Sequence, residues 1–285
     1  MAYHHWTNLL FQSILFFIVV CIPIYKTRRM SFVDIAWPWG LVVIGLVNYT
    51  HNEGSELMVL ISSSIISVIG LRMGIGALGL LKQGYLKKEL SRYQYQRIVW
   101  EKEKKHNTHL ALQIDAITQG LANVTFLAIP IFVAGSSNSE SLNIIQYVGL
   151  AVWLISIILE TVADRQKLNF LRQMKITGLK NQVCNIGLWK YTRHPNYFFE
   201  WMVWNGMVIS AVPSWLMLVN RESLTVWLLL GAGLLLASGF MYRTLVFITG
   251  AIPSEYYSAR KRPDYVNYQA VTNRFFPGIP KSTTK

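Results

Sequence analysis

Seven apolar runs, each close to the length of chain that crosses a bilayer as a helix, constrain the fold more than any other feature of the sequence. Of the 285 residues, 52% are hydrophobic and only 14% are charged. The first run has no basic segment before it and no small-residue cleavage site after it, so we expect it to be retained rather than cleaved as a signal peptide. These features predict an all-α integral membrane bundle of seven transmembrane helices, with residues 1–285 forming a single transmembrane domain. The runs lie near residues 7–25, 31–49, 57–81, 109–134, 143–163, 196–219 and 224–250.

Lysine and arginine are concentrated in the loops that follow the first, third, fifth and seventh runs. The loops between them hold few basic residues, and the loop around Glu53 holds no Lys or Arg. Cytoplasmic loops carry the excess of positive charge in membrane proteins, so this pattern predicts an external N-terminus and a cytoplasmic C-terminus. The net charge of +13 is then a topology signal and does not indicate nucleic-acid binding. It would also favour an anionic cofactor arriving from the cytosol.

Polar and ionisable residues inside the apolar runs fall in the halves predicted to face the cytoplasm. Charges in lipid are costly, so we expect these side chains to face a common cavity and to pair with one another. The alternative for single members, such as Arg72, is a purely structural ion pair. The pattern as a whole predicts a polar pocket that opens to the cytosol and has an apolar floor. The residues are Asp34, Arg72, Asp115, Gln119, Asn123, Glu160, Asp164, Lys167, Glu200 and Arg243.

The densest group of chemically active residues is the segment 187–200, Gly-Leu-Trp-Lys-Tyr-Thr-Arg-His-Pro-Asn-Tyr-Phe-Phe-Glu. Pro195 suits the first position of a helix, because its fixed φ fits a helix start and its missing N–H is not needed there. Such a start attracts anions, and Arg193 and His194 precede it directly. Asn196 and Glu200 are four residues apart and would share one helix face. The alternative is a basic membrane anchor followed by an ordinary span, which accounts for Arg193 but not for a buried Glu200.

The C-terminal tail carries a further polar segment, in which Tyr265 and Tyr268 would share a face if the segment is helical. The alternative is an amphipathic segment on the membrane surface. The two cysteines, Cys21 and Cys184, are too few for a zinc site and are not expected to pair. No metal is therefore expected.

Residues 187–200, with Arg-His-Pro-Asn-Tyr at their centre, resemble the C-terminal signature of the steroid 5α-reductase superfamily. The likeness is strongest to the bacterial membrane proteins of that superfamily, which is related to sterol reductases and to isoprenylcysteine carboxyl methyltransferases. The resemblance covers roughly residues 31–280. Three other stretches contribute to it, at residues 33–37, 163–168 and 262–269.

The resemblance implies a multi-pass membrane reductase, in a bacterial inner membrane, with its active site facing the cytoplasm. In that superfamily NADPH enters from the cytosol and gives a hydride to a conjugated C=C bond of a sterol-like enone, so the expected partners are a lipophilic small molecule and membrane lipid. We expect Asp34 and Glu200 to be the catalytic residues. The oligomeric state is left open. The residues expected to bind the cofactor are Asp164, Lys167, Arg193, His194, Asn196, Tyr197, Glu200, Arg262 and Tyr265.

The chain departs from the steroid-reducing members of the superfamily on the substrate side. Those members carry Gln-Glu in the second span, where this chain has Asp34 alone, and a Tyr in the third span, where Ile69 or a neighbour falls here. Two other functions therefore stay open. One is an S-adenosylmethionine-dependent methyltransferase of an isoprenoid or lipid, because such enzymes share the Arg-His-Pro-x-Tyr segment. The other is a lipid-binding or transport protein without catalytic activity, although the sequence shows no broken-helix pair to favour transport.

Overall fold

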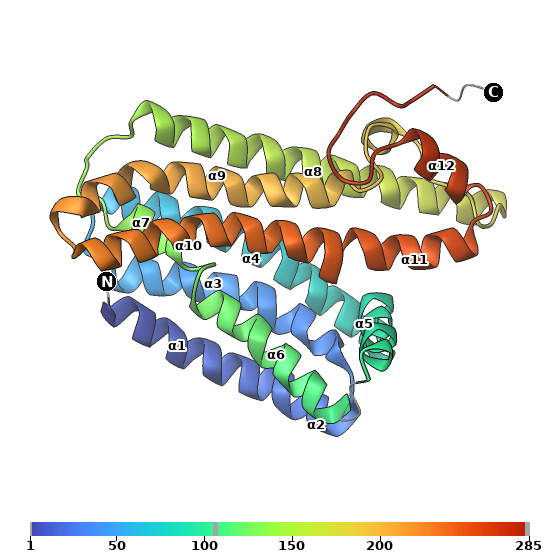
Figure 1. The fold of residues 1–285 in the computed structure, drawn as a ribbon, viewed down its shortest axis with the longest axis horizontal. Helices are drawn as coiled ribbons and strands as arrows, with labels where there is room; N and C mark the ends of the chain where they lie inside the picture. Colours follow the sequence, from blue (N-terminus) through green and yellow to red (C-terminus); the bar gives the residue numbers. More distant parts are fainter. Residues whose placement is uncertain (1, 105–107, 283–285) are drawn as a thin grey trace. The chain divides into compact units, whose positions relative to one another are not determined.

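A computed structural model describes residues 2–104 and 108–282 of the chain (Figure 1). All regular secondary structure in these residues is helical, with no strand, which confirms the predicted fold class. Seven helical segments are long and apolar enough to cross a membrane, so the chain is a multi-pass membrane protein. The orientation of its termini stays a prediction from loop charge. The segments are His4–Thr27, Met30–His51, Glu56–Lys82, Thr108–Gly135, Ile144–Thr177, Pro195–Asn220 and Leu224–Lys261.

The chain divides into two compact units, which are described separately. Unit 1 comprises Met1–Gly149 and Met207–Ala237, and unit 2 comprises Leu150–Gly206 and Ser238–Lys285. The helices α8 (Ile144–Thr177), α9 (Pro195–Met217) and α10 (Leu224–Arg243) each have residues in both units. The other helices of unit 1 are α1 (Ala2–Phe16), η1 (Phe17–Cys21), α2 (Ile22–Thr27), η2 (Met30–Phe32), α3 (Val33–His51), α4 (Glu56–Lys82), η3 (Tyr85–Lys87), α5 (Ser91–Lys102), α6 (Thr108–Val124), α7 (Ile129–Gly135) and η5 (Leu218–Asn220). The others of unit 2 are η4 (Gly187–Lys190), η6 (Thr244–Ile248), α11 (Ala251–Lys261) and α12 (Tyr265–Val271).

In unit 1, α3 and α4 pack closely because small residues lie between their backbones. A Cβ on Gly45 would lie 2.1 Å from the hydroxyl of Ser67, and one on Gly70 would lie 2.7 Å from the carbonyl oxygen of Pro38. Neither position has room for a side chain. Polar residues join the same pair of helices, since the Asn48 amide donates to the hydroxyls of Ser62 and Ser63 at 2.9 and 2.8 Å.

The first span contains one turn of π-helix, η1 (Phe17–Cys21), which ends two residues before Pro23. Proline has no N–H to donate to the preceding turn, and an insertion in the helical ladder is one way in which a helix adapts to it. The side-chain amide of Gln113, on α6, donates to the carbonyl oxygen of Cys21 at 3.0 Å. The irregular turn is therefore stabilised from the neighbouring span.

The fourth span is not one helix, because α6 ends at Val124 and α7 begins at Ile129. This break was not expected from the continuous apolar run over residues 109–134. Backbone groups at a break in a span need partners other than lipid. The amide of Asn8 donates to the carbonyl oxygen of Asn123 at 3.1 Å, and the Asn123 amide donates to the carbonyl oxygen of Trp37 at 3.1 Å. The break is thus built into a buried polar network between α1, α3 and α6.

In unit 2, the short helix η4 docks onto α8, at Ala163 and Gln166, through three contacts. Gly187 has a positive φ of 51°, and a Cβ there would lie 2.3 Å from the Gln166 amide nitrogen. The backbone N–H of Leu188 donates to the Gln166 side-chain oxygen at 2.9 Å, and the Trp189 indole donates to the carbonyl oxygen of Ala163 at 3.0 Å. Glycine is needed at position 187 for both its conformation and its lack of a side chain. This docking fixes the start of the segment that leads into α9.

Candidate functional site

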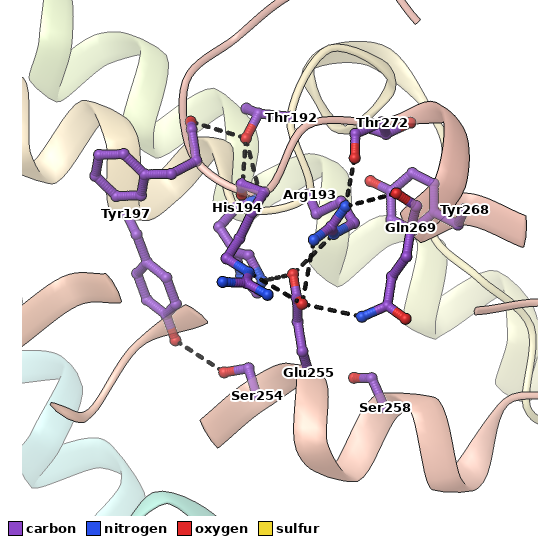
Figure 2. Close-up of polar contacts among 12 residues, drawn as sticks. Thr192, Arg193, His194, Tyr197, Ser254, Glu255, Ser258, Tyr268, Gln269 and Thr272 are labelled. Atoms are coloured by element: carbon purple, nitrogen blue, oxygen red, sulfur yellow. Dashed lines mark hydrogen bonds and ion pairs between the residues drawn. The ribbon is translucent and has the colours of Figure 1, made fainter. Parts of the chain in front are cut away.

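The centre of the candidate site is the carboxylate of Glu255 on α11, which is 5% exposed and accepts hydrogen bonds from four side chains (Figure 2). Its Oε1 lies 2.7 Å from Nε of Arg193 and 3.2 Å from Nε2 of His194. Its Oε2 lies 3.2 Å from Nη2 of Arg193, 3.0 Å from the Gln269 amide and 3.3 Å from Nε of Arg274. A buried charge must be paired and hydrogen-bonded, and this carboxylate is both.

Arg193 binds Glu255 with the two-point geometry that suits a planar guanidinium and a carboxylate. Its remaining terminal nitrogen, Nη1, donates to the carbonyl oxygens of Gln269, at 3.0 Å, and Thr272. The Arg193 side chain is only 7% exposed. Because its donors are directed at protein acceptors, Arg193 holds α11, α12 and the tail in place around the start of α9.

The C-terminal tail wraps around residues 191–193 just before α9 begins. The Thr192 hydroxyl lies 3.1 and 2.9 Å from the carbonyl oxygens of Arg274 and Phe275, to which it donates. The backbone N–H of Gly278 donates to the carbonyl oxygen of Tyr191 at 2.9 Å. The prediction that a helix starts at Pro195 is confirmed, since α9 begins there. The tail therefore fixes the segment that precedes this start.

His194 is 5% exposed, and its ring stacks on Tyr197 with centroids 5.4 Å apart and planes at 7°. Burial lowers the pKa of His194 below its usual value, against the opposing effect of the Glu255 carboxylate, and the nearby charges of Arg193 and Lys167 lower it further. The imidazole is therefore neutral at pH 7. A carboxylate only accepts, so Nε2 of this neutral ring carries the proton that it donates to Glu255.

Asn196, the second residue of α9, has a buried side-chain oxygen to which no described residue donates a hydrogen bond. Buried polar atoms are nearly always hydrogen-bonded, so each exception calls for an explanation. Tyr197 next to it places its hydroxyl 3.5 Å from the hydroxyl of Ser254. The side-chain oxygen of Asn196 is therefore able to accept a hydrogen bond from a bound molecule.

Two cations expected at the site lie close to this cluster. The Lys167 ammonium lies 4.5 Å from the centre of the Trp189 ring, in a cation–π contact. Arg262, between α11 and α12, donates from Nε to the carbonyl oxygen of Gln182 and from Nη1 to the Ser258 hydroxyl, both at 3.0 Å. Two positive charges of unit 2, Lys167 on α8 and Arg262 before α12, therefore lie near the Glu255 cluster.

Tyr265 and Tyr268 share a face of α12, as expected, with ring centroids 5.8 Å apart, and both are buried. Burial and the charge of Glu255 raise the pKa of Tyr265 to about 12, while Arg193 and Arg262 act in the opposite direction. Burial likewise raises the pKa of Tyr268, whose hydroxyl donates to the carbonyl oxygen of Trp189. Both phenols are therefore neutral at physiological pH, and α12 packs into unit 2.

The remaining expected cofactor residues, Asp164 and Glu200, also belong to unit 2. Asp164 lies on α8 one turn before Lys167, and Glu200 lies on α9 one turn after Asn196. Both are partly buried, and both interact with other residues. All nine residues expected to bind the cofactor therefore belong to one compact unit.

Asp34, the expected catalytic acid, belongs to unit 1, where both of its carboxylate oxygens have partners. Oδ2 forms an ion pair with Arg92, and Oδ1 accepts a hydrogen bond from the Tyr93 hydroxyl at 2.7 Å. Burial raises the pKa of Tyr93 well above its usual value, and the Asp34 charge adds to the effect, which Arg92 opposes. The third span lacks the tyrosine that the steroid-reducing members carry. In the structure it is Tyr93, from α5, that contacts Asp34.

Glu89, two residues before α5, holds this helix against η2, which leads into α3. Its carboxylate accepts from the backbone N–H groups of Met30 and Ser31 at 2.9 and 3.2 Å, and from the Ser31 hydroxyl at 2.8 Å. Arg97, one of the basic residues of α5, forms an ion pair with Glu89 at 3.1 Å. These contacts fix the position from which Tyr93 reaches Asp34.

Glu255, Thr192, Gln269 and Tyr93 were not expected at the site, although Thr192 and Gln269 lie in segments that the sequence singles out, 187–200 and 262–269. Glu255 carried a usable signal, because it is an acid near the end of an apolar run that loop charge predicts to be cytosolic, the same feature that singled out Glu200. Tyr93 lies in a polar segment outside these stretches and carries no such signal.

The fold and the site together define a helical multi-pass membrane protein with a buried Arg–His–Glu cluster at the start of its sixth span. The model of the family described as "Protein of unknown function (DUF1295)" matches residues 15–272, and the chain belongs to this family. That family lies in the steroid 5α-reductase-like superfamily, which confirms the resemblance at the level of the superfamily. No curated protein and no solved structure matches the chain.

Proposed function

We propose that the protein is a membrane-embedded reductase that uses NADPH to reduce a conjugated C=C bond in a steroid-like or other lipophilic enone. The superfamily assignment supports this proposal, as does the gathering of all the expected cofactor residues in unit 2. In this proposal the substrate comes from the membrane and the cofactor from the cytoplasm.

The observation that carries the proposal is the buried oxygen of Asn196, which has no donor among the described residues although it lies at the start of α9. The charge of Lys167 acts on His194, two residues earlier, and the charge of Arg262 acts on Tyr265. A carboxamide N–H or a ribose hydroxyl of NADPH would supply that donor. The phosphates of NADPH are matched by the two cations and by the positive end of α9. Tyr197, Asp164, Glu200 and Tyr265 complete the residues that we assign to this site.

Arg193 and His194 have a different role in the proposal from the one expected from sequence. Their donors are directed at Glu255 and at backbone carbonyls, so they position the start of α9 instead of binding a phosphate directly. Because Arg193 and His194 are buried and fully hydrogen-bonded, they are rigid, and a rigid pair holds the neighbouring Asn196 and Tyr197 in one geometry.

When bound, NADPH supplies the hydride that adds to the β carbon of the enone. The chain must polarise the carbonyl and provide for the proton that reaches the α carbon. For these tasks we propose the acids Asp34 and Glu200. Arg92 and Tyr93 hold the Asp34 carboxylate in one orientation, through an ion pair and a donated hydrogen bond.

A methyltransferase that uses S-adenosylmethionine is the competing proposal. S-adenosylmethionine carries a sulfonium cation and no phosphate. The charges of Lys167 and Arg262 act on His194 and Tyr265, and Arg274 pairs with Glu255, so the positive charge at the cluster favours a polyanionic cofactor.

Equilibrium binding of NADPH and of S-adenosylmethionine to the purified full-length protein in detergent tests the proposal. We expect NADPH to bind and Asn196→Ala to weaken it by about threefold to tenfold, the effect of one neutral hydrogen bond. Asn169→Ala, on an exposed part of α8, is the control and should bind like the wild type. Binding of S-adenosylmethionine without binding of NADPH would replace the proposal by the methyltransferase.

A further inference from the structure

The helix α8 is longer than the hydrocarbon core of a bilayer. Its 34 residues extend about 51 Å at about 1.5 Å per residue, whereas the hydrocarbon core is about 30 Å thick and the bilayer with its headgroup layers about 40–45 Å. The apolar part of α8, residues 144–163, accounts for about 30 Å of this length. The basic part that follows therefore begins where the headgroup layer of the membrane begins.

One face of α8 is exposed in the apolar part and stays exposed in the basic part. The residues on this face, in chain order, are Leu154, Ile158, Arg165, Arg172 and Ile176. They share a face because they are spaced by four, seven, seven and four residues along the helix. Glu160 and Ala163, on the opposite side of α8, are buried. The face that meets lipid along the span is therefore the face that carries Arg165 and Arg172.

The two arginines on this face are available to an external anion. In the part of the chain that the structure describes, the side chains of Arg165 and Arg172 form no ion pair and no hydrogen bond. The sequence has no Asp or Glu between Asp164 and Glu200, and Asp164 itself is half-buried and interacts with another residue. Lys175, one turn beyond Arg172, is exposed as well. The face therefore presents positive charge that is complementary to an anion at the edge of the membrane.

Arg165 and Arg172 meet different levels of the headgroup layer. Side chains of an α-helix lean toward its N-terminus, which on α8 is the membrane side, and a long basic side chain lies along apolar surface with its charge in the polar layer. Arg165 follows the apolar part by two residues, about 3 Å along the axis, at the level of the lipid phosphates. Arg172 lies about 10 Å further out. There phosphatidylcholine carries a trimethylammonium cation, which Arg172 repels, whereas phosphatidylglycerol carries a neutral diol, which accepts its hydrogen bonds.

We propose that this face of α8 binds an anionic phospholipid, with its phosphate on Arg165, the outer part of its headgroup at Arg172 and its acyl chains along Leu154 and Ile158. The continuity of the basic face with the lipid-exposed face of the span selects a lipid over a soluble acidic partner. The proposal concerns α8 alone, goes beyond the proposed reductase activity and does not depend on it.

Native mass spectrometry of the purified full-length protein in a non-ionic detergent resolves single bound lipids and tests the proposal. The protein is titrated with phosphatidylglycerol and, separately, with phosphatidylcholine of the same acyl chains, and the dissociation constant of the first bound lipid is measured. We expect phosphatidylglycerol to bind at least about fivefold more tightly, the effect of one basic residue near an anionic lipid. Glycerol phosphate, which has the phosphate without the acyl chains, should not displace it at the same concentration.

Two exposed basic residues serve as the variant and its control. Arg172→Gln removes the outer charge of the face, whereas Lys180→Gln removes the same charge from an exposed position beyond the end of α8. Arg172→Gln should weaken the binding of phosphatidylglycerol by about fivefold without weakening that of phosphatidylcholine, and Lys180→Gln should change neither. Arg165→Gln removes the phosphate contact and should weaken the binding of both lipids. Substitutions at such exposed positions usually alter stability little, so all three variants are expected to fold.

Equal affinity of the wild type for the two lipids would overturn the role of Arg172. If Lys180→Gln weakens the binding of phosphatidylglycerol as much as Arg172→Gln does, the attraction comes from the net charge of the whole segment, and the site on α8 is overturned. Displacement of the lipid by glycerol phosphate at the same concentration would leave a site for a free anion, without the acyl-chain contact. Displacement by a polyglutamate peptide would assign the face to a soluble acidic partner instead.

Discussion

Arg193 and Glu255 lie 62 residues apart in the sequence and form a two-point ion pair, with nitrogen–oxygen distances of 2.7 and 3.2 Å (Figure 2). Both side chains are more than nine-tenths buried. The pair links the segment before α9 to α11, and the other partners of Glu255 extend the link to α12 and the tail. One carboxylate thus holds four pieces of unit 2 around the start of the sixth span.

Removing the charge of Glu255 should destabilise the protein strongly. Glu255→Gln leaves the Arg193 guanidinium buried without its counter-charge, and the loss of one partner of a buried pair typically costs about 3–5 kcal/mol. Thermal unfolding of the purified variant in detergent measures the effect. Glu140→Gln, at an exposed position, is the control. Equal unfolding temperatures for the two variants would show that the pair adds nothing to stability.

Gly187 and Gly178 offer a matched pair of substitutions that separates backbone strain from lack of space. Both have positive φ, of 51° and 72°, but a Cβ on Gly178 meets nothing within 4 Å, whereas one on Gly187 meets the Gln166 side chain at 2.3 Å. Gly178→Ala should cost about 1–2 kcal/mol from its left-handed backbone alone. Gly187→Ala should cost more, because it also displaces Gln166 from Leu188. Thermal unfolding measures both losses of stability. If Gly187→Ala and Gly178→Ala lower the unfolding free energy equally, the Gln166 side chain moves aside at no cost.

The features that depend on local composition were predicted well from the sequence. The seven spans follow from runs of apolar residues, and the start of α9 follows from Pro195 after Arg193 and His194. The face shared by Tyr265 and Tyr268 follows from helical spacing. Each of these predictions uses residues that are neighbours along the chain, where helix geometry determines the outcome.

The features that depend on distant residues were not predicted. Nothing local in the sequence pairs Glu255 with Arg193, or brings Tyr93 from α5 to Asp34, because such pairs are set by how helices pack. The break after Val124 was missed for a similar reason. The surrounding run is apolar throughout, and the partner that makes the break tolerable, Asn8, lies on another span.

Stability should depend on pH through His194. Its pKa in the folded protein is lowered from 6.5, chiefly by burial, with Arg193 and Lys167 adding to the effect and Glu255 opposing it. The unfolded chain therefore binds a proton at a higher pH than the folded chain does. The contribution of the neutral imidazole to stability is complete above pH 6.5 and is lost as the pH falls from there through the folded pKa.

Unfolding temperatures of the wild type and of His194→Gln, measured across this pH range, test the assignment. The difference in unfolding free energy between the two proteins should shrink as the pH falls below 6.5, by at most about 1.4 kcal/mol per pH unit. A difference that does not change with pH would mean that His194 titrates alike in the folded and unfolded chains.

The choice of cofactor in the proposed reaction should depend on Arg262. NADPH carries a 2′-phosphate that NADH lacks, and a guanidinium is the side chain best suited to bind it. Arg262 lies at the same end of unit 2 as the cluster, since its charge and that of Arg193 both act on the hydroxyl of Tyr265. We expect the protein to prefer NADPH, and Arg262→Glu to weaken NADPH binding by at least about tenfold, the effect of losing one charged hydrogen bond.

Arg260→Glu makes the same charge change two residues away, at an exposed position where the arginine stacks on Tyr256, and is the matched control. If Arg262 contacts the 2′-phosphate, only Arg262→Glu narrows the preference for NADPH over NADH. If Arg262 contacts the pyrophosphate, Arg262→Glu weakens the binding of NADPH and of NADH to the same extent. Unchanged affinity for both, in a variant that unfolds at the wild-type temperature, would place Arg262 outside the site. Its role would then be limited to joining Gln182 and Ser258, whose oxygens already accept its hydrogen bonds.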